Sequence, residues 1–168
     1  MVKFVNALAF DFGHTLVHEH SVNGRIQLMP GVRELLPQIN LPMAVWANTQ
    51  AANEKELRKI LRAAGIEGYF SCVVTSIDAG FRKPAREFFQ FALAKGNLEK
   101  DSLLFVRNQL NTDVLGAERY GIRTAWLSGL EFRSEDETMT LDDAKPSFML
   151  SSLAQLPSLL QKIAGAVD

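Results

Sequence analysis

Polar and charged side chains follow several apolar runs of this 168-residue sequence, at the points where the runs end. Asp11 follows the first run, Asn48 the second and Arg107 the fourth, while Lys83 stands just before a predicted helix. A lysine close to a carboxylate lowers the pKa of that carboxylate, and an ionised aspartate can act as a nucleophile. Backbone N–H groups at helix starts suit an anion such as phosphate. If the fold brings these residues together, they indicate nucleophilic chemistry or anion binding.

The apolar runs predict the strands of a parallel α/β sheet. Most of the runs are continuous rather than alternating, as expected for strands that are covered on both faces. Helical patterns separate them, which favours a parallel sheet whose functional site lies at the carboxyl ends of the strands. The expected strands are 3–10, 43–47, 72–76, 102–106 and 123–127, with a weaker one at 147–150.

Two of the intervening helices have recognisable ends. Thr49 is expected to cap a helix that terminates at Gly65. Pro84 is expected in the first turn of the next helix, which would place Phe91 on its buried face and stop at Gly96.

Composition narrows the class of protein. The hydrophobic fraction is 47%, the charged fraction 22% and the formal net charge -1, so we expect no nucleic-acid partner and no membrane. The single cysteine, Cys72, cannot form an internal disulfide, and no signal peptide is recognised, which favours a cytoplasmic protein. One domain is expected over 1–168, with an acidic surface loop at 131–143.

Four short motifs occur in a particular order along the chain. They are "DFGHTL" (11–16), "WANTQ" (46–50), "FRKPAREFF" (81–89) and "VRNQLNTDVLGA" (106–117). In this order they resemble the motifs of the haloacid dehalogenase-like (HAD) superfamily of hydrolases, and the resemblance covers almost the whole chain.

The resemblance implies a Rossmann-like parallel sheet, flanked by helices on both faces in three layers. It makes Asp11 the nucleophile and Lys83 the cation that balances it. A magnesium ion, where one binds, would be held by Asp11, the backbone carbonyl of Gly13, Asn108 and Asp113.

Two departures from the family pattern concern proton transfer and phosphate binding. Gly13 stands where the family has its general acid–base residue, whose help is typically worth about 10²–10⁴-fold in rate. The neighbouring His14 is the candidate for that proton transfer, since histidines titrate near neutral pH. Ala47 replaces the hydroxyl that binds the phosphoryl group, which leaves Asn48 and Thr49 as candidates.

Two further departures concern the metal. Asn108 replaces a metal-binding carboxylate, and Arg107 replaces the glycine before it. The first change removes negative charge that a hard dication needs, and the second adds a guanidinium that repels the metal. We therefore expect Lys83 and Arg107 to supply positive charge in place of magnesium, whose binding is weakened or absent, and to contact an anion together with Asn48 and Thr49.

Residues 17–45 separate the first two motifs, which is too short a stretch for a cap domain. The family's dehalogenase and phosphonatase branches depend on cap residues, so the sequence argues against both activities. An open crevice admits water, and a small phosphorylated ligand, a protein partner or a second copy of the chain would cover it.

Two functions follow from this reading. One is a HAD-like domain with a weakened phosphatase site and a ligand- or partner-binding role. The alternative is an active phosphate-ester hydrolase that uses Asp11 as nucleophile, with an altered acid–base and metal arrangement. Purely structural roles also stay open: Asp11 as a cap of loop amides, Lys83 as its ion-pair partner and Asp113 as a helix cap.

Overall fold

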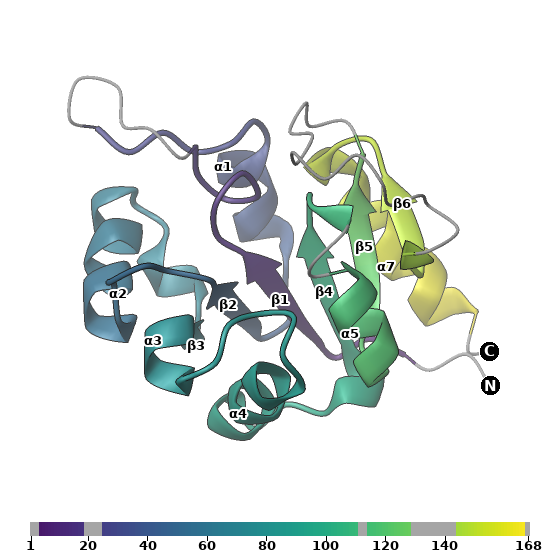
Figure 1. The fold of residues 1–168 in the computed structure, drawn as a ribbon. Helices are drawn as coiled ribbons and strands as arrows, with labels where there is room; N and C mark the ends of the chain where they lie inside the picture. Colours follow the sequence, from purple (N-terminus) through teal and green to yellow (C-terminus); the bar gives the residue numbers. More distant parts are fainter. Residues whose placement is uncertain (1–3, 19–24, 111–113, 129–143, 167–168) are drawn as a thin grey trace.

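The computed structural model describes residues 4–18, 25–110, 114–128 and 144–166, and a parallel sheet runs through its centre (Figure 1). Six strands of the described chain pair in the order β3-β2-β1-β4-β5-β6, and every neighbouring pair is parallel. The predicted parallel α/β sheet is confirmed. The strands are β1 (Ala7–Asp11), β2 (Met43–Ala47), β3 (Cys72–Thr75), β4 (Leu103–Arg107), β5 (Arg123–Leu127) and β6 (Phe148–Leu150).

Helices cover both faces of this sheet, as predicted. One apolar cluster joins the sheet to α1, α2 and the start of α7, and a second cluster joins it to α4 and α5. In Figure 1, α4 and α5 lie in front of the sheet, with α1 and α7 behind it. The helices are α1 (Val32–Leu35), α2 (Glu54–Ala63), α3 (Ser76–Ala79), α4 (Arg86–Gly96), α5 (Leu115–Tyr120) and α7 (Leu156–Gly165), and the 3-10 turns are η1 (Leu36–Gln38), η2 (Glu67–Tyr69), η3 (Lys100–Ser102) and η5 (Leu153–Gln155).

Aromatic side chains fill the layer between the sheet and α4. Trp46 is fully buried, and its ring centre lies 6.4 Å from that of Phe88, 6.0 Å from Phe89 and 5.2 Å from Phe105. Such aromatic contacts add to the free energy gained by burial. They fix α4, and the loop that precedes it, against the carboxyl-terminal half of the sheet.

The predicted start of α2 is wrong. Asn53, not Thr49, is the N-cap: its side chain accepts from the Glu56 amide, while the Glu56 carboxylate accepts from the Asn53 amide. This reciprocal pair satisfies two amides that a helix start otherwise leaves open, and Thr49 sits too far upstream to do so. The predicted end is confirmed, because Gly65 follows the last turn with a φ of 76°.

The predicted limits of α4 are also displaced. Pro84 precedes the helix, which begins at Arg86, and Gly96 lies within its last turn while Asn97 takes the left-handed conformation that ends it. Phe91 is 37% exposed, whereas Phe89 is fully buried. The buried face of α4 is therefore rotated from the predicted one, so that Phe91 falls at its edge.

Two further expectations from the sequence concern a membrane span and an acidic loop. None of the described helices combines the length and the apolar character that crossing a bilayer requires. The acidic stretch at 131–143 lies outside the described residues.

Helix α5 makes a very close approach to the loop before α4. A Cβ atom added at Gly116 would overlap Pro84 Cβ and lie 3.1 Å from Pro84 Cα. We therefore expect Gly116→Ala to lower the free energy of unfolding by about 1–3 kcal/mol, because the two segments must move apart. Urea denaturation measures this change.

The matched control is Gly165→Ala in α7, where an added Cβ would meet no atom within 4 Å. Replacing a helical glycine by alanine without a clash is expected to raise stability by roughly 0.5–1 kcal/mol. Equal effects of the two substitutions would contradict the close packing of α5 on Pro84.

Candidate active site

The strand order brings Asp11 and Arg107 to one place. β1 and β4 are neighbours, with Phe10 paired to Val106, so the two residues end adjacent strands at the point where the strand order reverses. Ligand sites of open α/β sheets lie in the crevice at this point. Arg107 is fully buried, and its Nη2 lies 3.7 Å from Oδ2 of Asp11, which is 9% exposed.

Lys83 reaches the same carboxylate from the loop that follows α3. Its Nζ donates to Asp11 Oδ1 at 2.6 Å and to the carbonyl of Trp46 at 2.8 Å. The side chain of Asn48 holds the backbone of Lys83, since Oδ1 accepts from the Lys83 amide at 2.8 Å and Nδ2 donates to its carbonyl at 2.9 Å. Asn48 therefore positions Lys83, and its contact with phosphate stays a prediction.

A phenylalanine ring lies against both cations, which the sequence analysis missed. The centre of the Phe105 ring is 5.2 Å from Lys83 Nζ and 5.8 Å from Arg107 Cζ. Cations are attracted to aromatic faces at such distances. The signal was available, because Phe105 precedes Arg107 by two residues on a strand and so projects from the same face. Gln109 was also missed, and its Oε1 accepts from Arg107 Nη2 at 3.3 Å.

The three charges shift one another's pKa. Burial raises the pKa of Asp11, but the attraction of Lys83 and then of Arg107 outweighs it, and the net pKa lies below the ordinary value. Burial lowers the pKa of Lys83 to about 8, against the opposing attraction of Asp11. Burial likewise lowers the pKa of Arg107 to about 10. At neutral pH Asp11 is an anion between two cations, and the sum of the three buried charges is positive.

The loop after β1 places a threonine on Asn108. Thr15 is fully buried, and its hydroxyl donates to Asn108 Oδ1 at 3.3 Å. Asn108 itself is 4% exposed, and its Nδ2 has no hydrogen-bond partner among the described residues. The side-chain oxygen that would face a metal is thus already accepting a hydrogen bond.

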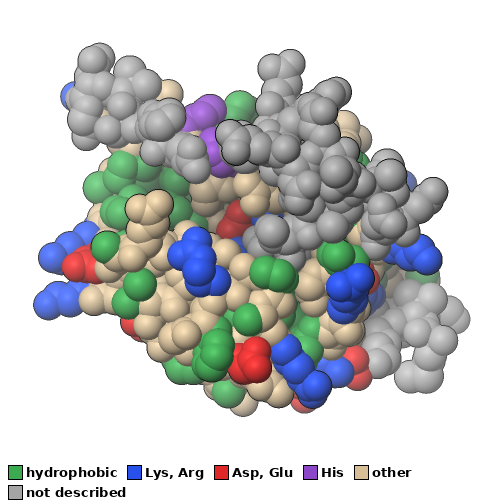
Figure 2. Space-filling model, in the orientation of Figure 1, with side chains coloured by type: hydrophobic (Ala, Val, Ile, Leu, Met, Phe, Trp, Pro, Cys, Tyr) green, Lys and Arg blue, Asp and Glu red, His purple; other side chains and the backbone are tan. Residues whose placement is uncertain are grey.

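Gly13 and His14 form the turn above this carboxylate. His14 takes a φ of 57°, and its amide donates to the carbonyl of Val17 at 2.7 Å. Figure 2 shows histidine atoms at the rim of a recess, with acidic and basic atoms below them. His14 itself is partly buried, and its role in proton transfer stays a prediction.

Two other candidates, Thr49 and Asp113, are not among the residues that the structure places around Asp11. The hydroxyl of Thr49 donates to the carbonyl of Ala52 at 2.6 Å, and its amide donates to Ser76 Oγ at 2.9 Å. The hydroxyl is thereby committed to its own turn, and the structure does not bring it to Asp11. Asp113 lies outside the described residues.

The described residues do not fit a magnesium ion. They contain no group of three or more acidic, histidine or cysteine side chains that could hold a metal. The two carboxylate oxygens of Asp11 face Lys83 and Arg107, and Gly13 offers no side chain. Magnesium requires near-octahedral oxygen ligands with negative charge, and a guanidinium in that position repels it.

This fold and this site belong to a known class. Residues 8–127 match the model of the Haloacid dehalogenase-like hydrolase family, and the chain therefore belongs to that family. The expected family membership is confirmed.

Particular relatives support this membership. The chain is 31% identical to the pyrimidine 5'-nucleotidase YjjG of Escherichia coli over 80% of this chain and 57% of the relative. It thus spans little more than half the length of that relative. An uncharacterized protein from Listeria monocytogenes serotype 4b has the same fold, with a TM-score of 0.80, 24% identity and coverage of 96% of this chain and 99% of that one. The HAD-hydrolase YfnB of Bacillus subtilis, whose structure is bound to magnesium, matches with a TM-score of 0.74, 16% identity and coverage of 94% and 99%.

Restoring the family's residues tests the poor fit to magnesium. We expect the double variant Arg107→Gly, Asn108→Asp to bind magnesium at least about tenfold more tightly than the wild type, measured by isothermal titration calorimetry. Removing a unit positive charge about 4 Å from a doubly charged ion is worth roughly 8 kcal/mol at an effective dielectric constant of 20, so the tenfold gain is a lower bound. Magnesium binding by the wild type as tight as by the double variant would contradict the effect of Arg107.

The buried lysine predicts a pH dependence of stability. The pKa of Lys83 is about 8 in the folded chain, against 10.5 for an unperturbed lysine. Between these values the unfolded state holds the extra proton, so the free energy of unfolding rises with pH by up to about 1.4 kcal/mol per pH unit. Urea denaturation across this range should show the rise in the wild type relative to Lys83→Met. Parallel curves for the two proteins would contradict it.

Proposed function

We propose that this chain is a HAD-like domain with little or no ordinary magnesium-dependent phosphatase activity, and that its crevice binds a phosphorylated or acidic ligand or a protein partner. One observation carries the proposal: both carboxylate oxygens of Asp11 face buried cations, Lys83 at 2.6 Å and Arg107 at 3.7 Å. Two cations so close to one carboxylate oppose the binding of a metal ion by that carboxylate.

Two features argue for weak phosphatase chemistry. A carboxylate that is paired on both oxygens must give up an attraction before it attacks phosphorus. Gly13 supplies no acid for the leaving group, and this help is typically worth about 10²–10⁴-fold in rate.

The charge of the site argues for anion binding. Lys83 and Arg107 place two positive charges around the single carboxylate of Asp11, and buried cations favour a negatively charged ligand. A Cβ atom added at Gly13 would meet no atom within 4 Å, and we expect residues 17–45 to be too short a stretch to cover the site as a cap domain. An anionic ligand, a partner protein or a second copy of the chain would exclude water from it.

An active hydrolase is the second candidate, and the low pKa of Asp11 favours it. The carboxylate is ionised at neutral pH, as a nucleophile must be. In this mechanism Asp11 attacks phosphorus, the ester oxygen leaves with a proton from His14, and water then hydrolyses the aspartyl phosphate. Lys83 and Arg107 would stabilise the charge of the transferring group.

Hydrolysis of an aryl phosphate tests the two candidates. We expect wild-type turnover, with and without magnesium, to be no greater than that of Asp11→Asn, because the nucleophile is paired and the acid is absent. The Escherichia coli nucleotidase is a positive control for the assay. Turnover that disappears in Asp11→Asn would refute the first proposal and support the hydrolase.

The same variants test the binding role by titration with inorganic phosphate. Asp11→Asn should bind phosphate at least about tenfold more tightly, since it removes the negative charge and leaves both cations. Arg107→Gln should bind it correspondingly less tightly. Phosphate affinities that are equal in all three proteins would exclude the crevice as an anion site.

A further inference from the structure

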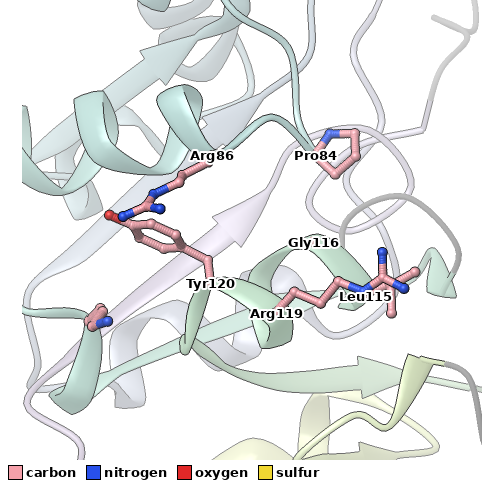
Figure 3. A pocket seen from close by; sticks show the side chains of 7 residues that line it. Pro84, Arg86, Leu115, Gly116, Arg119 and Tyr120 are labelled. Carbon is pink, nitrogen blue, oxygen red and sulfur yellow. The ribbon is translucent and has the colours of Figure 1, made fainter.

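A second pocket lies between α4 and α5, apart from the Asp11 carboxylate (Figure 3). Its volume is about 480 Å³, which lies in the range of sites that bind small molecules. No acidic side chain lines it, while three of its residues are cationic. The lining residues are Pro84, Arg86, Lys100, Leu115, Gly116, Arg119 and Tyr120.

Two of the cations share one aromatic ring. The centre of the Tyr120 ring is 5.6 Å from Arg86 Cζ and 5.4 Å from Lys100 Nζ. The ring is held by stacking on Phe89, with centres 5.8 Å apart and an interplanar angle of 18°. Phe89 is fully buried, so the stacking holds the Tyr120 ring in place. The ring therefore keeps Arg86 and Lys100 close together at one end of the pocket.

The third cation lies toward the other end. Figure 3 shows Arg86 against Tyr120, while Arg119 extends along α5 toward Leu115. Neither arginine, nor Lys100, forms an ion pair with any residue in the described part of the chain. Positive charge is thus placed at both ends of one cavity and is not neutralised by the described residues.

We propose that this pocket binds a small molecule that carries two phosphate groups. Like charges around a cavity repel, and a cation–π contact at an exposed position offsets little of that repulsion. The two phosphate groups would form charge-assisted hydrogen bonds with the arginines, which suit phosphate geometry. The apolar surfaces of Pro84 and Leu115 would contact the organic part of the molecule.

The dimensions favour a small molecule over a nucleic acid. Nucleic-acid sites are extended basic surfaces that track many phosphates, and they occur in domains of high positive charge. Here the cations surround one pocket, and the net charge of the chain is -1. The inference does not depend on the proposed function, because none of these residues contacts Asp11.

Titration with inorganic pyrophosphate tests the proposal. The wild type should bind pyrophosphate, and the double variant Arg86→Gln, Arg119→Gln should bind it about 100-fold less tightly, at about tenfold for each lost charged partner. Arg33→Gln is the matched control, since Arg33 is an exposed arginine on α1, which packs on the other face of the sheet. It should leave the affinity unchanged.

A footprint locates the site independently of the crevice. Pyrophosphate should protect Lys100 from acetylation, measured by mass spectrometry, in the wild type and in Arg33→Gln but not in the double variant. No binding by the wild type, equal binding by the double variant, or unchanged acetylation of Lys100 would each overturn the proposal. Binding of an oligonucleotide without binding of pyrophosphate would assign the basic residues to a nucleic acid and would also overturn it.

Discussion

The buried ion pair between Asp11 and Lys83 is the interaction on which the site depends. Burying each charge costs several kcal/mol, and only close contacts with further hydrogen bonds offset that cost. Lys83 meets this condition through Asp11 and the carbonyl of Trp46, while Asn48 fixes its backbone on both sides. The pair therefore joins the ends of β1 and β2 to the loop before α4, and loss of either partner removes the shortest contact that offsets the burial of the other.

Arg107 changes what this pair can do. In a site with one lysine and one carboxylate the charges cancel, and additional acids can attract a metal. Here a second cation lies on the free oxygen of Asp11 and against the same Phe105 ring as Lys83. The ring and Gln109 also contact the guanidinium. In the proposed binding role, Arg107 would oppose a magnesium ion and favour an anion.

The sequence predicted the sheet and the contact of Asp11 with Lys83 and Arg107 more successfully than the details around them. Continuous apolar runs identify buried strands, and parallel strands carry their following residues to one edge. The predicted role of Thr49 and the predicted buried face of α4 were wrong because both relied on the expected first residue of a helix. A single capping or proline residue in the sequence does not determine where a helix begins. In the structure a capping pair at Asn53 begins α2, and α4 begins at Arg86, where its apolar side packs on the sheet.

The hydrophobic pattern of the sequence does not predict how closely α4 and α5 pack. This packing forms the cationic pocket. Pro84 follows Lys83 directly, and Gly116 permits α5 to approach it so closely that no side chain fits between them. The contacts that position Lys83 therefore also position Pro84, which lines the pocket. The side chain of Asn48 is hydrogen-bonded to both the amide and the carbonyl of Lys83. A shift of Pro84 would therefore disturb these two hydrogen bonds. The same short loop thus carries the cation of the Asp11 site and one wall of the pocket, which makes its position a common requirement of both.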